Sequence, residues 1–207
     1  MLYPDRMAAG RALGGSMMHL RASDPLVLGL PRGGVPVAAA VRSVIGGDLD
    51  ILLVRKLGVP WQPELAMGAI GEGGVRVLND DVLRQTGVRP DQVAAVEKSE
   101  TAELERRQRI LRAEIPPIPL KDRVVVLVDD GMATGATVAV ACEIARLHEP
   151  RRIIVAVPVS SSEAIRRIRP LADDIVCPLI PHVLGGVGGA YRDFHQLADE
   201  EVIALLR

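Results

Sequence analysis

Cysteine and aromatic residues are scarce in this chain of 207 residues, which has two cysteines, one tryptophan, two tyrosines and one phenylalanine. The cysteines, Cys142 and Cys177, stand in no Cys-x-x-Cys and in no spacing typical of metal ligands. Two cysteines cannot form the disulfide framework of a small secreted domain, so a reducing intracellular compartment is expected. The sequence therefore indicates neither a disulfide scaffold nor a cysteine-based metal site.

The chain also lacks an excess of charge of either sign and any long apolar run. Its formal net charge is −1, which gives no reason to expect nucleic acid or an anionic membrane surface as a partner. No apolar run approaches the roughly 20 residues that cross a bilayer. Asp5, Arg6 and Arg11 interrupt the apolar residues of the first segment, unlike a signal peptide. We therefore expect a cytoplasmic protein with no nucleic-acid or membrane partner.

What the chain does have is a high apolar content, 48%, beside 25% charged residues, and its length suits a single domain over residues 1–207. Apolar runs typical of buried strands alternate with stretches of helical periodicity. The predicted strands are residues 25–30, 48–58, 124–128, 151–159 and 174–180, and the predicted helices are residues 5–22, 35–45, 90–115, 137–148 and 161–172. Two further apolar runs, 65–70 and 75–79, flank the Gly-rich residues 71–74 and predict a hairpin.

This alternation predicts an α/β fold: a parallel twisted sheet with helices on both faces, plus a small hairpin region. In such sheets the ligand lies at the carboxyl ends of the strands. Two loops at those ends have unusual chemistry, namely residues 31–34, with the sequence PRGG, and residues 129–137, with the sequence DDGMATGAT.

The second of these loops follows the apolar run Val124–Val128 directly. Two carboxylates come first, and small residues follow them up to the start of a predicted helix: Asp129, Asp130, Gly131, Met132, Ala133, Thr134, Gly135, Ala136 and Thr137. Small side chains leave backbone N–H groups uncovered at the positive end of the helix dipole, and the threonine hydroxyls can add donors. The loop therefore predicts a cup for a phosphate group.

The two carboxylates repel a phosphate and need hydrogen-bond donors instead. The hydroxyl groups of a ribose are suitable donors, and a metal ion could be held close by. Taken alone, Asp129 and Asp130 are equally compatible with an ordinary turn and helix cap. The loop contains neither the Gly-Lys-Ser/Thr of a nucleoside-triphosphate loop nor the G-x-G-x-x-G of a dinucleotide turn.

The stretch Val124–Thr137, VVVLVDDGMATGAT, resembles the motif with which type I phosphoribosyltransferases bind phosphoribosyl pyrophosphate (PRPP). The resemblance implies that Asp129 and Asp130 are the catalytic acids at the ribose hydroxyls. It implies that Gly131–Thr137 hold the 5′-phosphate. It also implies Mg²⁺ as cofactor, which the two acids would help to place indirectly, through the ribose hydroxyls or through water.

Two basic positions fit the same resemblance. Arg32 offers a forked donor, and Gly33 and Gly34 allow backbone amides to approach oxygen atoms, so residues 31–34 resemble the pyrophosphate loop of the family. Lys56 resembles a lysine that follows the second core strand in the orotate and adenine enzymes, where it reaches the pyrophosphate and assists catalysis. As isolated features, the first would be an ordinary turn and the second a solvated lysine.

The tail resembles a group of predicted phosphoribosyltransferases of unassigned substrate, a likeness that extends over the whole chain. It contains V-G-x-x-Y-x-D-F followed by D-E-E-V, and residues 175–207 are expected to build a hood over the base. Tyr191 is a candidate to stack on the base and His182 to face it, whereas Phe194 is expected to anchor the tail in the core. Core packing for Tyr191 and a surface position for His182 are the alternatives.

The resemblance implies transfer of ribose 5-phosphate from PRPP to a nitrogenous base, with release of pyrophosphate. Ala133 stands where the hypoxanthine-guanine enzymes carry an aspartate, which argues against 6-oxopurine chemistry and leaves the small-molecule acceptor open. Residues 63–74 fall in the region of the family's mobile loop, and the helix 90–115 is expected to pack or to build a homodimer. A non-catalytic module that senses PRPP or a nucleotide, or another phospho-ribose enzyme on the same fold, is the alternative.

Overall fold

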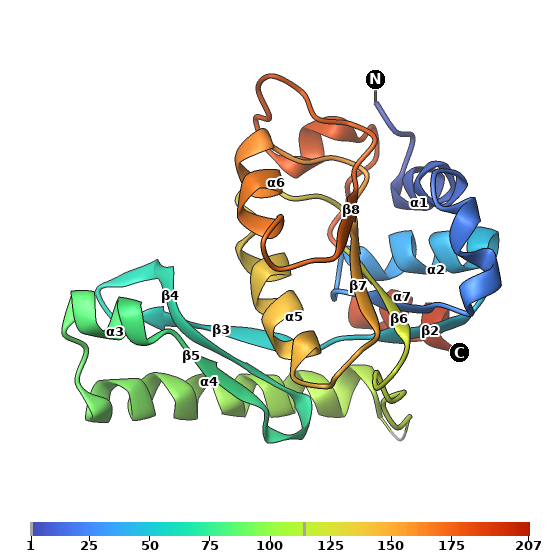
Figure 1. Ribbon diagram of the computed structural model, residues 1–207. Coiled ribbons are helices and arrows are strands. Elements are labelled where there is room, and N and C mark those ends of the chain that lie inside the picture. Colours follow the sequence, from blue (N-terminus) through green and yellow to red (C-terminus); the bar gives the residue numbers. More distant parts are fainter. Residues whose placement is uncertain (1, 114) are drawn as a thin grey trace.

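The chain forms two separate β-sheets in the computed structural model, which describes residues 2–113 and 115–207 (Figure 1). The larger sheet is parallel, with strand order β2-β1-β6-β7-β8, and the smaller one is antiparallel, with order β3-β4-β5. The parallel strands are β1 (Leu26–Gly29), β2 (Asp48–Ile51), β6 (Val124–Val128), β7 (Arg152–Ala156) and β8 (Asp174–Val176). The α/β fold predicted from the sequence is confirmed.

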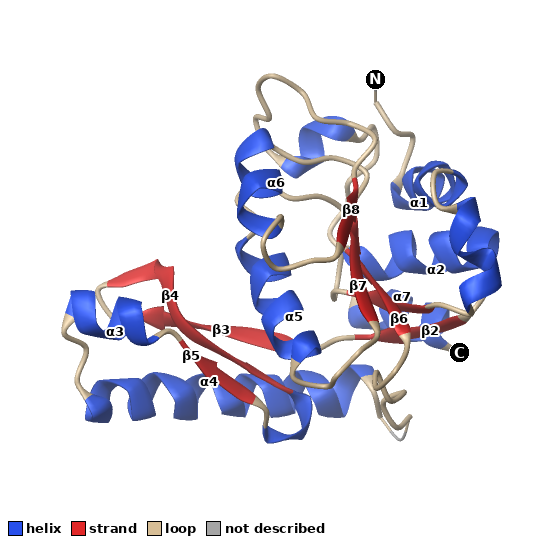
Figure 2. Ribbon diagram, in the orientation of Figure 1, coloured by secondary structure: helices blue, strands red, loops and turns tan. Residues whose placement is uncertain are grey.

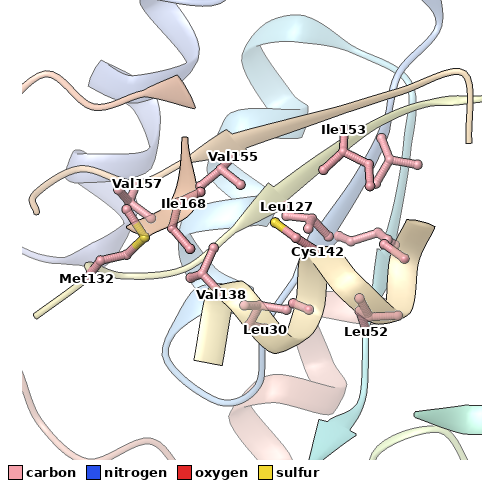
Figure 3. Close-up of a cluster of buried hydrophobic side chains, with 14 of the residues drawn as sticks. Leu30, Leu52, Leu127, Met132, Val138, Cys142, Ile153, Val155, Val157 and Ile168 are labelled. Atoms are coloured by element: carbon pink, nitrogen blue, oxygen red, sulfur yellow. The ribbon is translucent and has the colours of Figure 1, made fainter. Parts of the chain in front are cut away.

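Helices cover both faces of the parallel sheet (Figure 2). One face carries α1 (Arg6–Gly15), the 3₁₀ helix η1 (Met18–Ser23) and α2 (Gly34–Ile45), and the other carries α5 (Ala136–Arg146) and α6 (Ser162–Ile168). Side chains alternate between these two cores because successive strand residues point to opposite faces. Val126 packs toward α2, whereas its neighbour Leu127 packs toward α5 beside Val138 and Cys142 (Figure 3).

The antiparallel sheet projects from this body as an arm, defined here as residues 54–111 (Figure 1). Its elements are β3 (Val54–Val59), β4 (Gln62–Gly71), the turn η2 (Glu72–Gly74), β5 (Arg76–Leu78), α3 (Asp80–Thr86) and α4 (Pro90–Leu111). The apolar stripe of α4 packs on this sheet through Val93, Leu104 and Leu111. The arm therefore has a core of its own, which is continuous with the body near α2.

The predicted strand 48–58 is wrong as a single element. Its first part is β2 in the parallel sheet, and its second part is β3, which leaves that sheet and pairs antiparallel with β4. The apolar residues 51–54 run without interruption across the junction, which contains no glycine or proline, so the pattern gave no break. The division follows from packing, because Leu53 and Leu57 are buried with the arm and not with α5.

Other predicted boundaries also shift. The first helix ends at Gly15 and continues as η1, and the 90–115 helix ends at Leu111, with its predicted residue 114 outside the described residues. The hairpin predicted around residues 71–74 is confirmed as the β4–β5 pair. The predicted hood segment divides: η3 (Val187–Ala190) lies near the N-terminal segment, whereas α7 (Asp199–Leu206) packs against α2 and α4 and buries Val202 there.

A buried ionic cluster joins the arm to the body. Arg112, 4% exposed, donates from Nη1 to Asp50 at 2.8 Å and from Nη2 to Glu72 at 2.9 Å. Its Nη2 also donates to the carbonyl oxygen of Ile51 at 2.8 Å. Asp50 belongs to β2 and Glu72 follows β4, so one guanidinium ties three segments together where the chain crosses from one sheet to the other.

Among the helices in the described part of the chain, none combines the length and the apolar character that a bilayer crossing requires.

Candidate functional site

The loop after β6 is fastened by its one buried side chain, Met132. The amide of Met132 donates to the carbonyl oxygen of Val159 at 2.9 Å, and its own carbonyl accepts from Ser161 N–H at 3.0 Å. Gly135 has a positive φ of 73°, which lets the chain turn into α5. Met132 was predicted to bind a phosphate through its amide. That amide already donates to Val159, so in the structure Met132 fastens the loop to the segment after β7.

Three residues of the loop are open to solvent. Ala133, Thr134 and Thr137 are exposed, and Thr134 Oγ1 accepts the amide of Ala136 at 3.4 Å. These residues stand at the amino end of α5, a helix of 11 residues. Uncovered amides, hydroxyls and the positive end of the helix dipole therefore coincide here, which is the arrangement that an anion requires.

The two acids at the end of β6 have different partners. Asp129 Oδ1 accepts the backbone N–H of Asp130 at 2.9 Å, whereas Asp130 Oδ2 accepts from Arg6 Nε at 2.9 Å. Burial raises the pKa of Asp129 well above its usual range, and the neighbouring carboxylate of Asp130 raises it further. Burial also raises the pKa of Asp130, although its hydrogen bond to Arg6 opposes this. The guanidinium of Arg6 is therefore one positive charge beside the two carboxylates of Asp129 and Asp130.

The loop after β1 lies directly against these acids. The amide of Leu30 donates to the carbonyl oxygen of Val128 at 2.9 Å. A Cβ on Gly33 would stand 2.0 Å from Asp130 Oδ2, and a Cβ on Gly34 would stand 2.4 Å from the carbonyl oxygen of Val128. Both positions therefore have room only for glycine. The two loops that the sequence singled out are packed together at the carboxyl edge of the sheet.

Arg32 lies in the same loop and joins Pro31 through a cis peptide bond. Its guanidinium is partly exposed and forms a long ion pair, 3.7 Å, with Asp199 of α7. Because both partners are well solvated, the attraction between them is weak. Arg32 can therefore exchange this partner for an anion at modest cost.

A cavity of about 620 Å³ opens between these loops and the arm. Pro31 lines it from the β1 loop, Thr134 and Thr137 line it from the amino end of α5, and Lys56 lines it from the arm. The Nζ atom of Lys56 in β3 is 3.3 Å from Glu64 Oε2 in the neighbouring strand β4. Lys56 was expected at the end of a parallel strand; it lies within β3 instead, yet it faces the same cavity as the phosphate loop.

Tyr191 and His182, the two residues predicted at the base, do not line this cavity, and neither do Arg32, Asp129 and Asp130. Tyr191 is 6% exposed and its ring packs against Tyr3 and Phe194, so no ring face is free to stack on a base. Its hydroxyl donates to the carbonyl oxygen of Asp130 at 2.5 Å. His182 is exposed on the loop after β8 and is not among the residues that line the cavity. Phe194, expected in the core, is partly exposed and covers Arg6.

Two residues of this region were not predicted from the sequence. Arg6 reaches Asp130 from the first turn of α1, and Arg107 of α4 lines the cavity opposite Thr134. Arg6 leaves one signal in the sequence, because a cation in the first turn opposes the helix dipole and so suggests a partner elsewhere. Arg107 also pairs with Glu103, one turn earlier on the same helix, at 2.9 Å.

The chemistry of the two acids fits a hard divalent cation such as Mg²⁺. Carboxylate oxygens are its preferred protein ligands, and Arg6 balances only one of the two negative charges. Within the described residues, no group of three or more His, Cys, Asp or Glu side chains is arranged to hold a metal ion. A cation at this place would thus take part of its ligands from a bound phosphate or from water.

The chain is similar in sequence and in fold to known proteins. The sequence pattern of the phosphoribosyl transferase domain matches residues 6–192. Two Mycobacterium tuberculosis proteins, from strains H37Rv and CDC 1551, carry the provisional name of phosphoribosyl transferase, and each is 48% identical to the chain over 205 residues. The match covers 99% of this chain and 46% of each relative, so the chain spans about half the length of these curated proteins.

Among solved structures, the crystal structure of the protein TT1426 from Thermus thermophilus is similar over the whole chain. Its sequence identity is 42% and its TM-score 0.93, and the match covers 100% of this chain and 98% of that one. The arm, the parallel sheet and the two loops therefore belong to an arrangement that the two proteins share.

Proposed function

The chain belongs to the phosphoribosyl transferase domain family, and from this premise we propose that it transfers ribose 5-phosphate from PRPP to a nitrogenous base and releases pyrophosphate. The observation that carries the proposal is the contact between the two loops. Gly33 lies against Asp130, so a ligand on one loop is within reach of groups on the other. PRPP needs such a pair of neighbouring subsites because it carries a phosphate at one end and a pyrophosphate at the other.

The 5′-phosphate is assigned to the exposed part of the loop after β6. Backbone amides around the start of α5, apart from the Ala136 amide that donates to Thr134, and the hydroxyls of Thr134 and Thr137 supply donors. Hydrogen bonds to a charged group are worth roughly 1.5–3 kcal/mol each, so a few of them suffice to hold the phosphate firmly. Asp129 and Asp130, which precede this loop, accept hydrogen bonds from the ribose hydroxyls.

The pyrophosphate is assigned to Arg32, Gly33 and Gly34, with Lys56 approaching from the arm. Transfer forms a bond from the acceptor nitrogen to the anomeric carbon and breaks the bond from that carbon to pyrophosphate, whose oxygen takes the electron pair. Positive charge develops on the ribose and negative charge on pyrophosphate. Asp129 and Asp130 lie near the first charge, and Arg32 and Lys56 near the second, so the fixed charges complement the separating ones.

The acceptor nitrogen loses a proton in this reaction, and that proton passes to the departing pyrophosphate or to solvent water. Mg²⁺, when bound with PRPP, supplies positive charge that lowers the cost of forming free pyrophosphate. The acceptor is a small molecule, and a homodimer is the proposed assembly. Because Ala133 leaves no carboxylate beside the base, acceptors other than 6-oxopurines are favoured.

Calorimetric titration with PRPP, with and without Mg²⁺, is the first test. Metal-dependent binding in the micromolar range is the expected result, and pyrophosphate release should then appear with a suitable purine, pyrimidine or other amine. Binding without release for every acceptor would favour a PRPP-sensing module. Folded protein that fails to bind PRPP at millimolar concentration would contradict the transferase function.

A further inference from the structure

Arg6 is held in place by three contacts around Asp130. Its side chain is 9% exposed, and its Nε donates to Asp130 Oδ2 at 2.9 Å. Its Nη1 donates to the carbonyl oxygen of His195 at 2.9 Å, and its Cζ lies 3.9 Å from the centre of the Phe194 ring. A guanidinium fixed on both its edge and its face loses little further freedom when it binds a carboxylate.

Both ends of the chain contribute to this arrangement. The amide of Tyr3 donates to the carbonyl oxygen of Ala190 at 2.8 Å, which fastens the N-terminal segment to the tail. Tyr191 stacks on Phe194 with ring centres 5.0 Å apart and donates its hydroxyl to the carbonyl oxygen of Asp130. The tail therefore forms a hydrogen bond to the backbone of Asp130 through Tyr191, and Arg6 forms one to its side chain.

Arg6 engages one carboxylate oxygen of Asp130 and thereby sets the direction of the other. Oδ2 is also the oxygen that faces Gly33, so the side chain is confined from two sides. Oδ1, the oxygen that Arg6 does not bind, is therefore the one that we assign to a ligand. The Asp130 side chain is 14% exposed, so a ligand can approach the carboxylate group only through a narrow opening.

We propose that Arg6 is a positioning residue for ribose recognition, orienting Asp130 so that one of its oxygens meets a hydroxyl of the bound ribose. The inference rests on the proposed function. Arg6 touches no substrate in this scheme, and it acts only through Asp130. Two other roles for the Arg6–Asp130 ion pair make different predictions. The pair could only stabilise the fold, or it could block the site until a ligand breaks it.

Binding of ribose 5-phosphate, compared with 2-deoxyribose 5-phosphate and 3-deoxyribose 5-phosphate, separates these roles. The wild-type protein should prefer ribose 5-phosphate over both analogues. In Arg6→Ala the preference for ribose 5-phosphate over at least one analogue should fall about tenfold. A change of this size corresponds to the loss of one hydrogen bond to a charged group. Arg6→Lys should keep part of the preference because it retains a cation near Asp130.

Arg11→Ala is the matched control, since Arg11 is exposed on the same helix. Its preference for ribose should equal that of the wild type. Circular dichroism and thermal unfolding check that each variant is folded, and Arg6→Gln and Arg6→Lys provide the comparison if the alanine variant does not fold. Gln should then lose the preference and Lys should keep part of it.

Four outcomes would overturn the proposal. Arg6 variants that keep the full preference would show that Asp130 needs no positioning, and equal weakening of all three ligands would point to a purely structural tie. Tighter binding of ribose 5-phosphate would identify a pair that blocks the site. A wild-type protein without any preference for ribose would contradict the proposed function as well, so the two failures can be told apart.

Discussion

Gly33 and Asp130 lie in direct contact at the carboxyl edge of the parallel sheet. A Cβ on Gly33 would lie 2.0 Å from Oδ2 and 2.6 Å from Cγ of Asp130, far inside contact distance. The two residues come from loops that follow neighbouring strands, β1 and β6. The glycine is therefore required by the carboxylate beside it, and the conformation of one loop constrains the other.

Gly33→Ala should displace the carboxylate of Asp130. The backbone of Gly33 has a φ of −60°, which alanine also adopts, so the effect should come from the side-chain collision alone. We expect the affinity for ribose 5-phosphate to fall at least about tenfold, the value of one charged hydrogen bond, in a calorimetric titration. Gly15→Ala is the control, because a Cβ there meets nothing within 4 Å. Unchanged affinity in Gly33→Ala would contradict the coupling of the loops.

Asp129→Asn should separate stability from binding. Burial and the neighbouring carboxylate of Asp130 raise the pKa of Asp129, so the ionised form is costly in the folded protein. An asparagine can still accept the amide hydrogen bond of Asp130, so the melting temperature should stay equal or rise. Metal-dependent PRPP binding should be lost. A variant that unfolds more easily would show that the carboxylate is structural.

Thr134→Val should weaken binding of 5′-phosphorylated ribose. Thr134 is exposed at the amino end of α5, and its hydroxyl is the group that valine removes. Loss of one hydrogen bond to a phosphate corresponds to about tenfold in affinity. Affinity for free pyrophosphate should not change. Thr86→Val, on α3, tests for a general effect of the substitution. Equal loss of both ligands would mean that the subsites are wrongly assigned.

Arg112→Met should destabilise the protein strongly without touching the cavity. It leaves Asp50 and Glu72 buried without their cation, and breaking a buried ion pair in this way costs roughly 3–5 kcal/mol. Urea unfolding measures this loss. Arg109→Met, at an exposed position in the last turn of α4, which ends just before Arg112, should change stability little. If the two variants are equally stable, the cluster does not hold the arm to the body.

Trp61 offers a signal for movement of the arm. It is the only tryptophan of the chain, is 57% exposed, and lies in the turn between β3 and β4 beside Pro60, which lines the cavity. If the β3–β4 turn closes over PRPP, the indole of Trp61 should become buried and its fluorescence emission should shift to the blue. Pyrophosphate alone is the control ligand. An emission spectrum that stays constant at saturating PRPP would argue against closure.

The sequence by itself determined the chemistry of the two loops. Residues 129–137 are consecutive, so their acids, glycines and threonines are brought together by a single strand-to-helix turn whatever the rest of the chain does. The apolar runs determined the parallel sheet, because strands buried on both faces read as unbroken hydrophobic segments. Parallel strands end at one edge, and the meeting of residues 31–34 with residues 129–137 follows from that geometry.

Tertiary structure decided which residues complete the site. Arg6 and Asp130 are separated by 124 positions, and only the packing of the N-terminal segment against the tail brings them together. The same packing buries Tyr191, whose ring is otherwise a plausible surface for a base. Hydrophobic periodicity also could not tell that β3 leaves the parallel sheet, because strands of either sheet can show the same apolar pattern. Burial and pairing depend on partners distant in sequence, so those features required the folded molecule.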